Sequence, residues 1–134
     1  MTQEAPGPRR FSHAMRLHNP EQFESVLRYR GVEADGRGDA RARRRQGRGT
    51  WFAVSARPNG LSYGRLGIIA ARKTVPLAVA RNRHKRLIRE TFRSLQDALG
   101  GVDLVVRVMA DAGGLHTRRA AREELVRLML AMAQ

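Results

Sequence analysis

One basic segment limits the folds open to this chain more than any other. Residues 81–93 read Arg-Asn-Arg-His-Lys-Arg-Leu-Ile-Arg-Glu-Thr-Phe-Arg, and their apolar positions recur with the spacing of a helix. At about 100° per residue, one arc of roughly 140° collects Arg81, Asn82, Lys85, Arg86, Arg89 and Arg93. The opposite, packing side collects Ala80, His84, Leu87, Ile88, Thr91, Leu95 and Ala98. So dense a cationic face repels itself unless a polyanion neutralises it, and we expect it to dock onto folded RNA.

The whole chain shares this basic character. Its 134 residues include 26 Lys and Arg against 12 Asp and Glu, for a formal charge of +14, and nearly all the bases are Arg. A planar guanidinium donates two hydrogen bonds to one phosphate and also stacks on bases. The length fits one domain with a modest core. The composition therefore favours a nucleic-acid binder over a protein that carries charge only for solubility.

Other classes of protein are disfavoured by what the chain lacks. No segment approaches the roughly 20 apolar residues of a spanning helix. Residues 1–10 lack the apolar core of a secretory signal. The absence of Cys excludes disulfides and thiolate metal sites. We expect a cytoplasmic protein with no membrane partner.

The N-terminal part predicts an arm followed by a short helix. Residues 1–18 are polar and basic, and we expect them to form a flexible arm. Asn19 has the features of an N-cap, with Pro20 at the first helical position and Gln22 completing a box-like pattern. Gly31 can supply the residue that ends this helix.

The next segment predicts a loop and then two strands. Residues 31–50 are Gly, Arg and Asp with almost nothing apolar, so they form a loop insert whose Arg side chains either condense onto RNA or stay solvated. Residues 51–57 and 65–71 have the apolar content of strands, and Pro58-Asn59-Gly60 is a turn signal between them. The two strands are therefore expected to form a hairpin.

The C-terminal half predicts helix, strand and helix. The basic helix covers roughly residues 78–99 and stops at Gly100-Gly101. Residues 102–109 form a third strong strand, and Thr117 caps a last helix that runs to about residue 133. The order α, two or three strands, α, β, α predicts one two-layer α/β domain over residues 19–134, with helices packed against one sheet.

No catalytic or metal-binding constellation is apparent in the sequence. The four His residues lack metal-ligand spacing, and we expect His84 to be a satisfied, half-buried side chain. Glu90, Glu123 and Glu124 are expected to be ordinary charges on helix surfaces. We therefore predict no catalytic residue, no metal ligand and no protein-bound cofactor.

Two segments together carry a specific resemblance. Residues 66–73, Leu-Gly-Ile-Ile-Ala-Ala-Arg-Lys, followed after seven residues by the 81–93 segment, closely resemble the bacterial ribonuclease P protein subunit with its RNR motif. The resemblance covers about residues 16–133. It implies a compact α+β two-layer sandwich with a left-handed βαβ crossover, an exception to the usual hand, similar to domains in a small-subunit ribosomal protein and a translocation GTPase.

The resemblance also implies a function and partners. In that family a catalytic RNA cleaves the phosphodiester with bound Mg²⁺, and the protein is the accessory subunit of the endoribonuclease. The protein docks on the catalytic RNA and holds the single-stranded 5′ leader of precursor tRNA, which promotes formation of the mature tRNA 5′ end. No obligate protein partner is implied.

The same resemblance assigns roles to residues of this chain. The RNA-binding set is Arg72, Lys73, Arg81, Asn82, Arg83, Lys85, Arg86, Arg89 and Arg93. The leader would lie between the first helix and the sheet, on Phe23, Leu27, Trp51 and Ser55. Leu27 and Ser55 stand where the family often has aromatics, and Trp51 shares strand parity with Ser55. Core packing is the alternative role for Phe23 and Trp51.

Three other functions remain as alternatives. An architectural RNA-binding protein, such as a ribosomal protein, would share the basicity and the α/β fold. A protein-only nuclease is disfavoured because no constellation of carboxylates and His is evident. A duplex-DNA binder is disfavoured because no helix-turn-helix pair is apparent.

Overall fold

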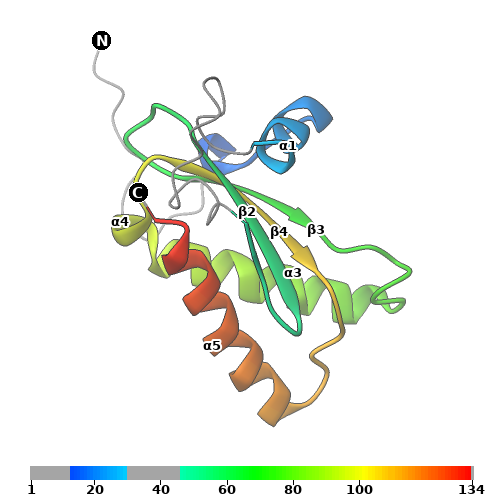
Figure 1. Ribbon diagram of the computed structural model, residues 1–134. Coiled ribbons are helices and arrows are strands. Elements are labelled where there is room, and N and C mark those ends of the chain that lie inside the picture. Colours follow the sequence, from blue (N-terminus) through cyan, green and yellow to red (C-terminus); the bar gives the residue numbers. More distant parts are fainter. Residues whose placement is uncertain (1–12, 30–45, 134) are drawn as a thin grey trace.

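The computed structural model describes residues 13–29 and 46–133 (Figure 1). Expectations for residues 1–12 and for most of the 31–50 insert, including Gly31, lie outside these ranges. The described elements are η1 (His13–Met15), α1 (Pro20–Leu27), β1 (Gln46–Arg48), β2 (Phe52–Pro58), β3 (Arg65–Ile69), α3 (Ala78–Ser94), α4 (Gln96–Leu99), β4 (Val102–Val108) and α5 (Leu115–Ala131). None of these helices is long and apolar enough to cross a membrane.

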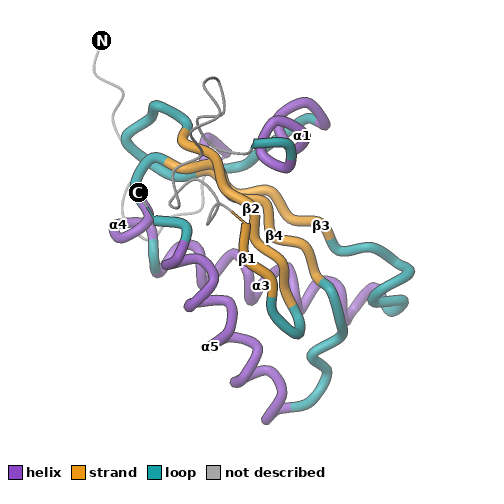
Figure 2. The backbone as a smooth tube through the Cα atoms, in the orientation of Figure 1, coloured by secondary structure: helices purple, strands orange, loops and turns teal. Residues whose placement is uncertain are grey.

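The four described strands form one mixed sheet in the order β1-β2-β4-β3 (Figure 2). β2 runs antiparallel to β1 and β4, whereas β3 runs parallel to β4. The predicted hairpin of β2 and β3 is therefore wrong, because β4 lies between them. The five residues 102–106 are all buried, as expected of a central strand covered on both faces. The predicted left-handed crossover through α3 stays a prediction.

Helices cover both faces of this sheet, which confirms the mixed α+β class. α3 and α5 pack on one face over the main core, whose largest buried side chains include Phe52, Leu104 and Phe92. α1 packs on the opposite face over a smaller cluster of Leu17, Val26 and Val105. Figure 1 shows this separation of α1 from the two long helices. The sheet therefore presents two chemically different sides.

The first helix begins where the sequence predicts. The Asn19 side chain accepts a hydrogen bond from the Gln22 amide at 2.9 Å, and the Gln22 side chain accepts one from the Asn19 amide at 3.3 Å. Pro20 occupies the first helical position, and Arg28 is the C-cap. This reciprocal capping box fixes the start of α1.

Two segments that we expected to be irregular are ordered parts of the fold. Met15 and Leu17, in the predicted arm of residues 1–18, are buried, and the Leu17 amide donates to the Leu66 carbonyl at 3.0 Å. β1 lies inside the predicted loop insert of residues 31–50 and pairs with β2. β1 has almost no apolar content, so its strand structure comes from pairing with β2 rather than from local sequence.

The helix boundaries differ from those predicted. The basic helix does not continue to residue 99: α3 ends at Ser94, and the short α4 follows Leu95. Ala98, expected on the packing side, is exposed for that reason. Thr117 is not a cap, since α5 begins at Leu115 after an extended Gly114 whose position carries no capping side-chain bond.

Candidate nucleic-acid interface

α3 separates a packing side from a cationic side much as its periodicity predicts. Its buried residues are Ala80, His84, Ile88, Thr91 and Phe92. Phe92 is fully buried and was absent from the predicted packing set. Of the predicted RNA-binding side chains on α3, Asn82, Arg83, Arg86 and Arg93 are exposed, while Arg81, Lys85 and Arg89 are half-buried. Arg83 thus joins the outward face, although it lies outside the predicted arc.

Several of these basic side chains are oriented by bonds within their own segment. Arg81 donates from Nη1 to the carbonyls of Val75 and Pro76, at 2.9 and 2.7 Å. Arg89 Nε donates to the Lys85 carbonyl at 3.2 Å. A guanidinium has five N–H donors, so these bonds orient the groups and leave donors for phosphate.

An open hollow runs along this face of α3. Its lining is Val79, Asn82, Arg83, Arg86, Arg89, Glu90 and Arg93. Glu90 forms an ion pair with Arg86 at 3.5 Å, so the excess charge of the hollow is positive. Arg72 and Lys73 are exposed in the turn that leads from β3 towards α3. We refer to these α3 side chains and the turn as the docking face.

The sheet face under α1 holds three of the four predicted leader residues. Phe23 and Leu27 pack against the small cluster of Leu17, Val26 and Val105. The Phe23 ring lies so close over Gly67 that a Cβ there would be 2.6 Å from the ring. Ser55 is on this face because it pairs directly with Val105 across the sheet.

Trp51 lies elsewhere. It precedes β2 and packs against the main core under α3 and α5, and its amide donates to Glu124 Oε2 at 2.9 Å. The predicted shared face of Trp51 and Ser55 is therefore wrong. Strand alternation fails for Trp51 because β2 begins only at Phe52.

The strand register places two further basic residues on the sheet face under α1, and these were not predicted from the sequence to lie there. Arg48 pairs with Ala53, Ala53 pairs with Arg107, and Arg107 pairs with Ile69, so these side chains form one row on the α1 face. Arg48 and Arg107 are exposed. Neither residue is on the same strand as Ser55, so only the order and register of the strands, which the sequence did not reveal, place them on this face.

A polar network holds the end of this sheet. Arg65 donates from Nε and Nη2 to the two oxygens of Asp103, at 2.8 and 2.7 Å. The hydrogen bond to Asp103 raises the pKa of Arg65 above its ordinary value. Asn59 also donates to Asp103 at 2.9 Å and accepts from the Leu61 amide at 2.8 Å. The loop between β2 and β3 is thereby attached to β4.

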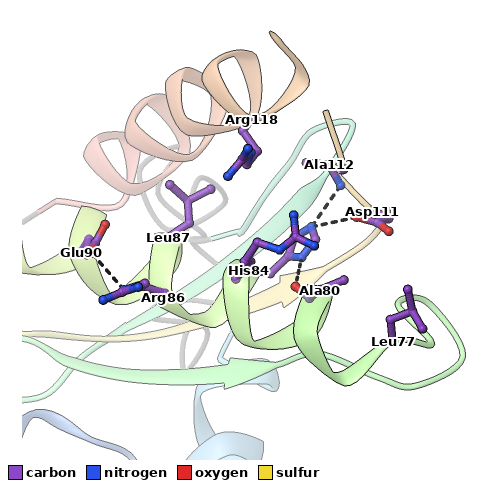
Figure 3. Close-up of a pocket in the computed structure, with 11 residues that line it drawn as sticks. Leu77, Ala80, His84, Arg86, Leu87, Glu90, Asp111, Ala112 and Arg118 are labelled. Atoms are coloured by element: carbon purple, nitrogen blue, oxygen red, sulfur yellow. Dashed lines mark hydrogen bonds and ion pairs between the residues drawn. The ribbon is translucent and has the colours of Figure 1, made fainter. Parts of the chain in front are cut away.

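A second hollow lies between α3 and the turn that joins β4 to α5 (Figure 3). His84 is buried here: Nε2 accepts from the Ala112 amide at 3.0 Å, and Nδ1 lies 2.6 Å from the Ala80 carbonyl. An amide can only donate, so Nδ1 carries the ring proton and donates to Ala80. His84 is thus satisfied as expected, although it is buried rather than half-buried.

The acidic residues do not form a metal site in the described part of the chain. Across residues 13–29 and 46–133, no group of three or more His, Asp or Glu side chains could hold a metal ion. Glu124, expected to be a surface charge, is instead buried and accepts bonds from three consecutive amides, those of Thr50, Trp51 and Phe52. Its role is therefore to attach α5 to the start of β2.

Comparisons with known proteins agree on one family. The sequence profile described as Ribonuclease P matches residues 39–132. A "Ribonuclease P protein component" from Azoarcus sp. is 34% identical over 134 residues, covering 100% of this chain and 99% of that protein. One from Methylococcus capsulatus is 46% identical over 107 residues, covering 80% and 73%. The solved RNase P protein from Thermotoga maritima has a TM-score of 0.61 at 26% identity, covering 89% of this chain and 98% of that one.

Proposed function

This chain belongs to the ribonuclease P protein family and is the protein component of that endoribonuclease, and we propose that its two surfaces bind two different RNA segments. The docking face on α3 binds the catalytic RNA. The α1 face of the sheet holds the 5′ leader of precursor tRNA. The partner RNA, with Mg²⁺, carries out the phosphodiester cleavage, and the reaction takes place in the cytoplasm.

The observation that carries the first assignment is the composition of the docking face. A 17-residue helix presents its basic side chains outward around one open hollow while its apolar side is buried. Binding to RNA releases the counterions that its phosphates condense, so a face of this kind gains affinity from every phosphate it neutralises. Closely packed phosphates that are neutralised by Arg and Lys require fewer Mg²⁺ ions.

The second assignment is supported by the mixed chemistry of the α1 face. Phe23 offers an aromatic ring, Ser55 a hydroxyl, and Arg48 and Arg107 two exposed cations on one row. Single-stranded RNA is bound by such combinations of stacking side chains and basic side chains. A mature tRNA lacks the leader, so contacts on this face favour the substrate over the product.

The two surfaces lie on opposite sides of the sheet. α3 packs over the main core, while Phe23 packs over the cluster that contains Val105. One protein can therefore remain docked on the catalytic RNA through α3 while the other side of the sheet contacts the leader.

The deciding experiment incubates labelled precursor tRNA at low Mg²⁺ with the purified protein, with bacterial ribonuclease P RNA, or with both. We expect cleavage at the mature 5′ end only when both are present. Equal cleavage by the RNA with and without protein, at Mg²⁺ where a known subunit helps, would favour an architectural RNA-binding role. Cleavage by the protein alone would show an autonomous nuclease.

A further inference from the structure

The second hollow, between α3 and the start of α5, is lined by two kinds of side chain, and we refer to it as the groove (Figure 3). Apolar side chains line it from the start and middle of α3, namely Leu77, Ala80 and Leu87. Guanidinium groups line it from both helices, namely Arg83, Arg86 and Arg118. Its volume of about 510 Å³ is within the range of small-molecule sites. Leu77 is 71% exposed, which is unusual for a large apolar side chain beside so many charges.

We propose that this groove receives one unstacked nucleotide of the catalytic RNA, with its base against Leu77 and its phosphate on Arg118 and Arg83. This inference rests on the proposed function, because it assumes that α3 docks on that RNA. An unpaired nucleotide has both an apolar face and an anionic phosphate, and the groove offers a partner for each.

The charges around the groove favour a phosphate. Two carboxylates also line it, but Glu90 forms an ion pair with Arg86 at 3.5 Å. Asp111 Oδ1 lies 3.5 Å from His84 Nε2, which already accepts from the Ala112 amide, so His84 does not offset this carboxylate. Arg83 and Arg118 outweigh the one remaining carboxylate, that of Asp111, and the net charge of the lining is positive.

The position of the groove points to the catalytic RNA rather than the leader. It shares Arg83, Arg86 and Glu90 with the open hollow of the docking face, so the two are continuous. It also lies on the side of the sheet away from α1. His84 bonds to Ala80 on α3 and to Ala112 after β4, which holds the two walls together before any RNA arrives.

The test measures binding of the full chain to ribonuclease P RNA over a range of salt concentrations. Arg118→Ala should weaken binding and reduce the slope of log affinity against log salt by up to about 0.7–0.9, the value for one phosphate, since Arg83 alone then contacts the phosphate. Leu77→Ala should weaken binding by about fivefold with the slope unchanged, because an apolar contact with a base releases no counterion.

Each variant has a matched control. Arg119 follows Arg118 on α5, is exposed, and forms an ion pair with Glu123 at 3.8 Å outside the groove. Leu130 is an exposed apolar residue near the other end of α5. Arg119→Ala and Leu130→Ala should bind like the wild type. Far-ultraviolet circular dichroism of all four variants should match the wild type, because every altered side chain is exposed.

The outcomes separate this inference from the proposed function. If Arg118→Ala and Leu77→Ala bind like the wild type while Arg89→Ala binds more weakly, the proposed nucleotide site in the groove is wrong. The docking face then stands. An equal loss for Arg119→Ala overturns it too, since the effect is then long-range charge. If both variants bind ribonuclease P RNA normally but the assembled enzyme binds precursor tRNA more weakly, the inference is overturned and the groove belongs to the leader. If Arg89→Ala also binds normally, the docking face itself is wrong.

Discussion

The carboxylate of Glu124 on α5 fills the space that a side chain at Gly49 would need. A Cβ built on Gly49 would collide with this carboxylate. Oε1 accepts from the Thr50 amide at 2.6 Å, and Oε2 accepts from the amides of Trp51 and Phe52 at 2.9 and 3.1 Å. These charge-assisted bonds join the last helix to the turn between β1 and β2.

Glu124→Gln is therefore expected to destabilise the protein. The amide replaces one acceptor oxygen by a donor that faces backbone donors, which should lower the free energy of unfolding by about 1–3 kcal/mol. Urea unfolding measures the change. Glu123→Gln, on the exposed neighbour, should leave stability nearly unchanged. Equal stability of the two variants would contradict this role of Glu124.

Asp103→Asn is expected to lower the free energy of unfolding by about 2 kcal/mol, because the two-point pairing with Arg65 is lost. Asp97→Asn, on an exposed position of α4, is the matched control. The Arg65 pKa is raised in the folded state, so its contribution is fully present below the ordinary Arg pKa and is lost only above it. The difference from wild type should be the same at about pH 6 and about pH 9. A difference that vanished between these pH values would refute the ion pair.

Arg86→Ala combined with Arg89→Ala tests the docking face. If each side chain touches one phosphate of the catalytic RNA, the salt slope of binding should fall by about 1.4–1.8, twice the value for one contact. Titration of labelled RNA at several salt concentrations measures it. Arg127→Ala, at an exposed position of α5, serves as the single-charge control. An unchanged slope in the double variant would mean that another face meets the RNA.

Arg107→Ala tests the leader surface without disturbing the core, because this side chain is exposed. We expect the assembled enzyme to lose affinity for precursor tRNA several-fold and to bind mature tRNA as before. Shortening the leader one nucleotide at a time should remove the difference between variant and wild type. Arg122→Ala, at an exposed position of α5, should have no such effect. If the loss of affinity does not depend on the length of the leader, the assignment of Arg107 to the leader surface is wrong.

Local signals predicted the elements that local chemistry determines. The capping box of Asn19 and Gln22 fixed the start of α1, and the periodicity of residues 81–93 identified the two sides of α3. The docking face was predictable for the same reason, since helix spacing alone decides which residues share a side. Among the basic residues, Arg83 on α3 and Arg72 and Lys73 in the turn were the exceptions, and only the resemblance to a known family included them.

Long-range pairing decided what the sequence could not. β1 has no apolar signal and is a strand only because β2 pairs with it. The turn at Asn59 predicts that the chain reverses between β2 and β3, but no local sequence signal shows that β4 lies between these two strands. Helix spacing places Glu124 beside the apolar stripe of α5 and Glu123 on the opposite side, but only the packing of α5 against the Gly49 turn shows what the Glu124 carboxylate binds. The position of Trp51 against the main core could not be predicted either, because its amide is bound by the same Glu124 carboxylate.

The position of β4 has a consequence for a nascent chain. It is the last of the four described strands to be synthesised, yet it lies between β2 and β3 and supplies Val105 under α1 and Leu104 over the main core. α1 and α3 both precede this strand in the chain and are synthesised before it. Until β4 pairs, the docking face and the α1 face both lack the central strand on which their helices pack. Both surfaces should therefore form together, after residue 108 has been synthesised. A truncation before residue 102 would remove both activities at once.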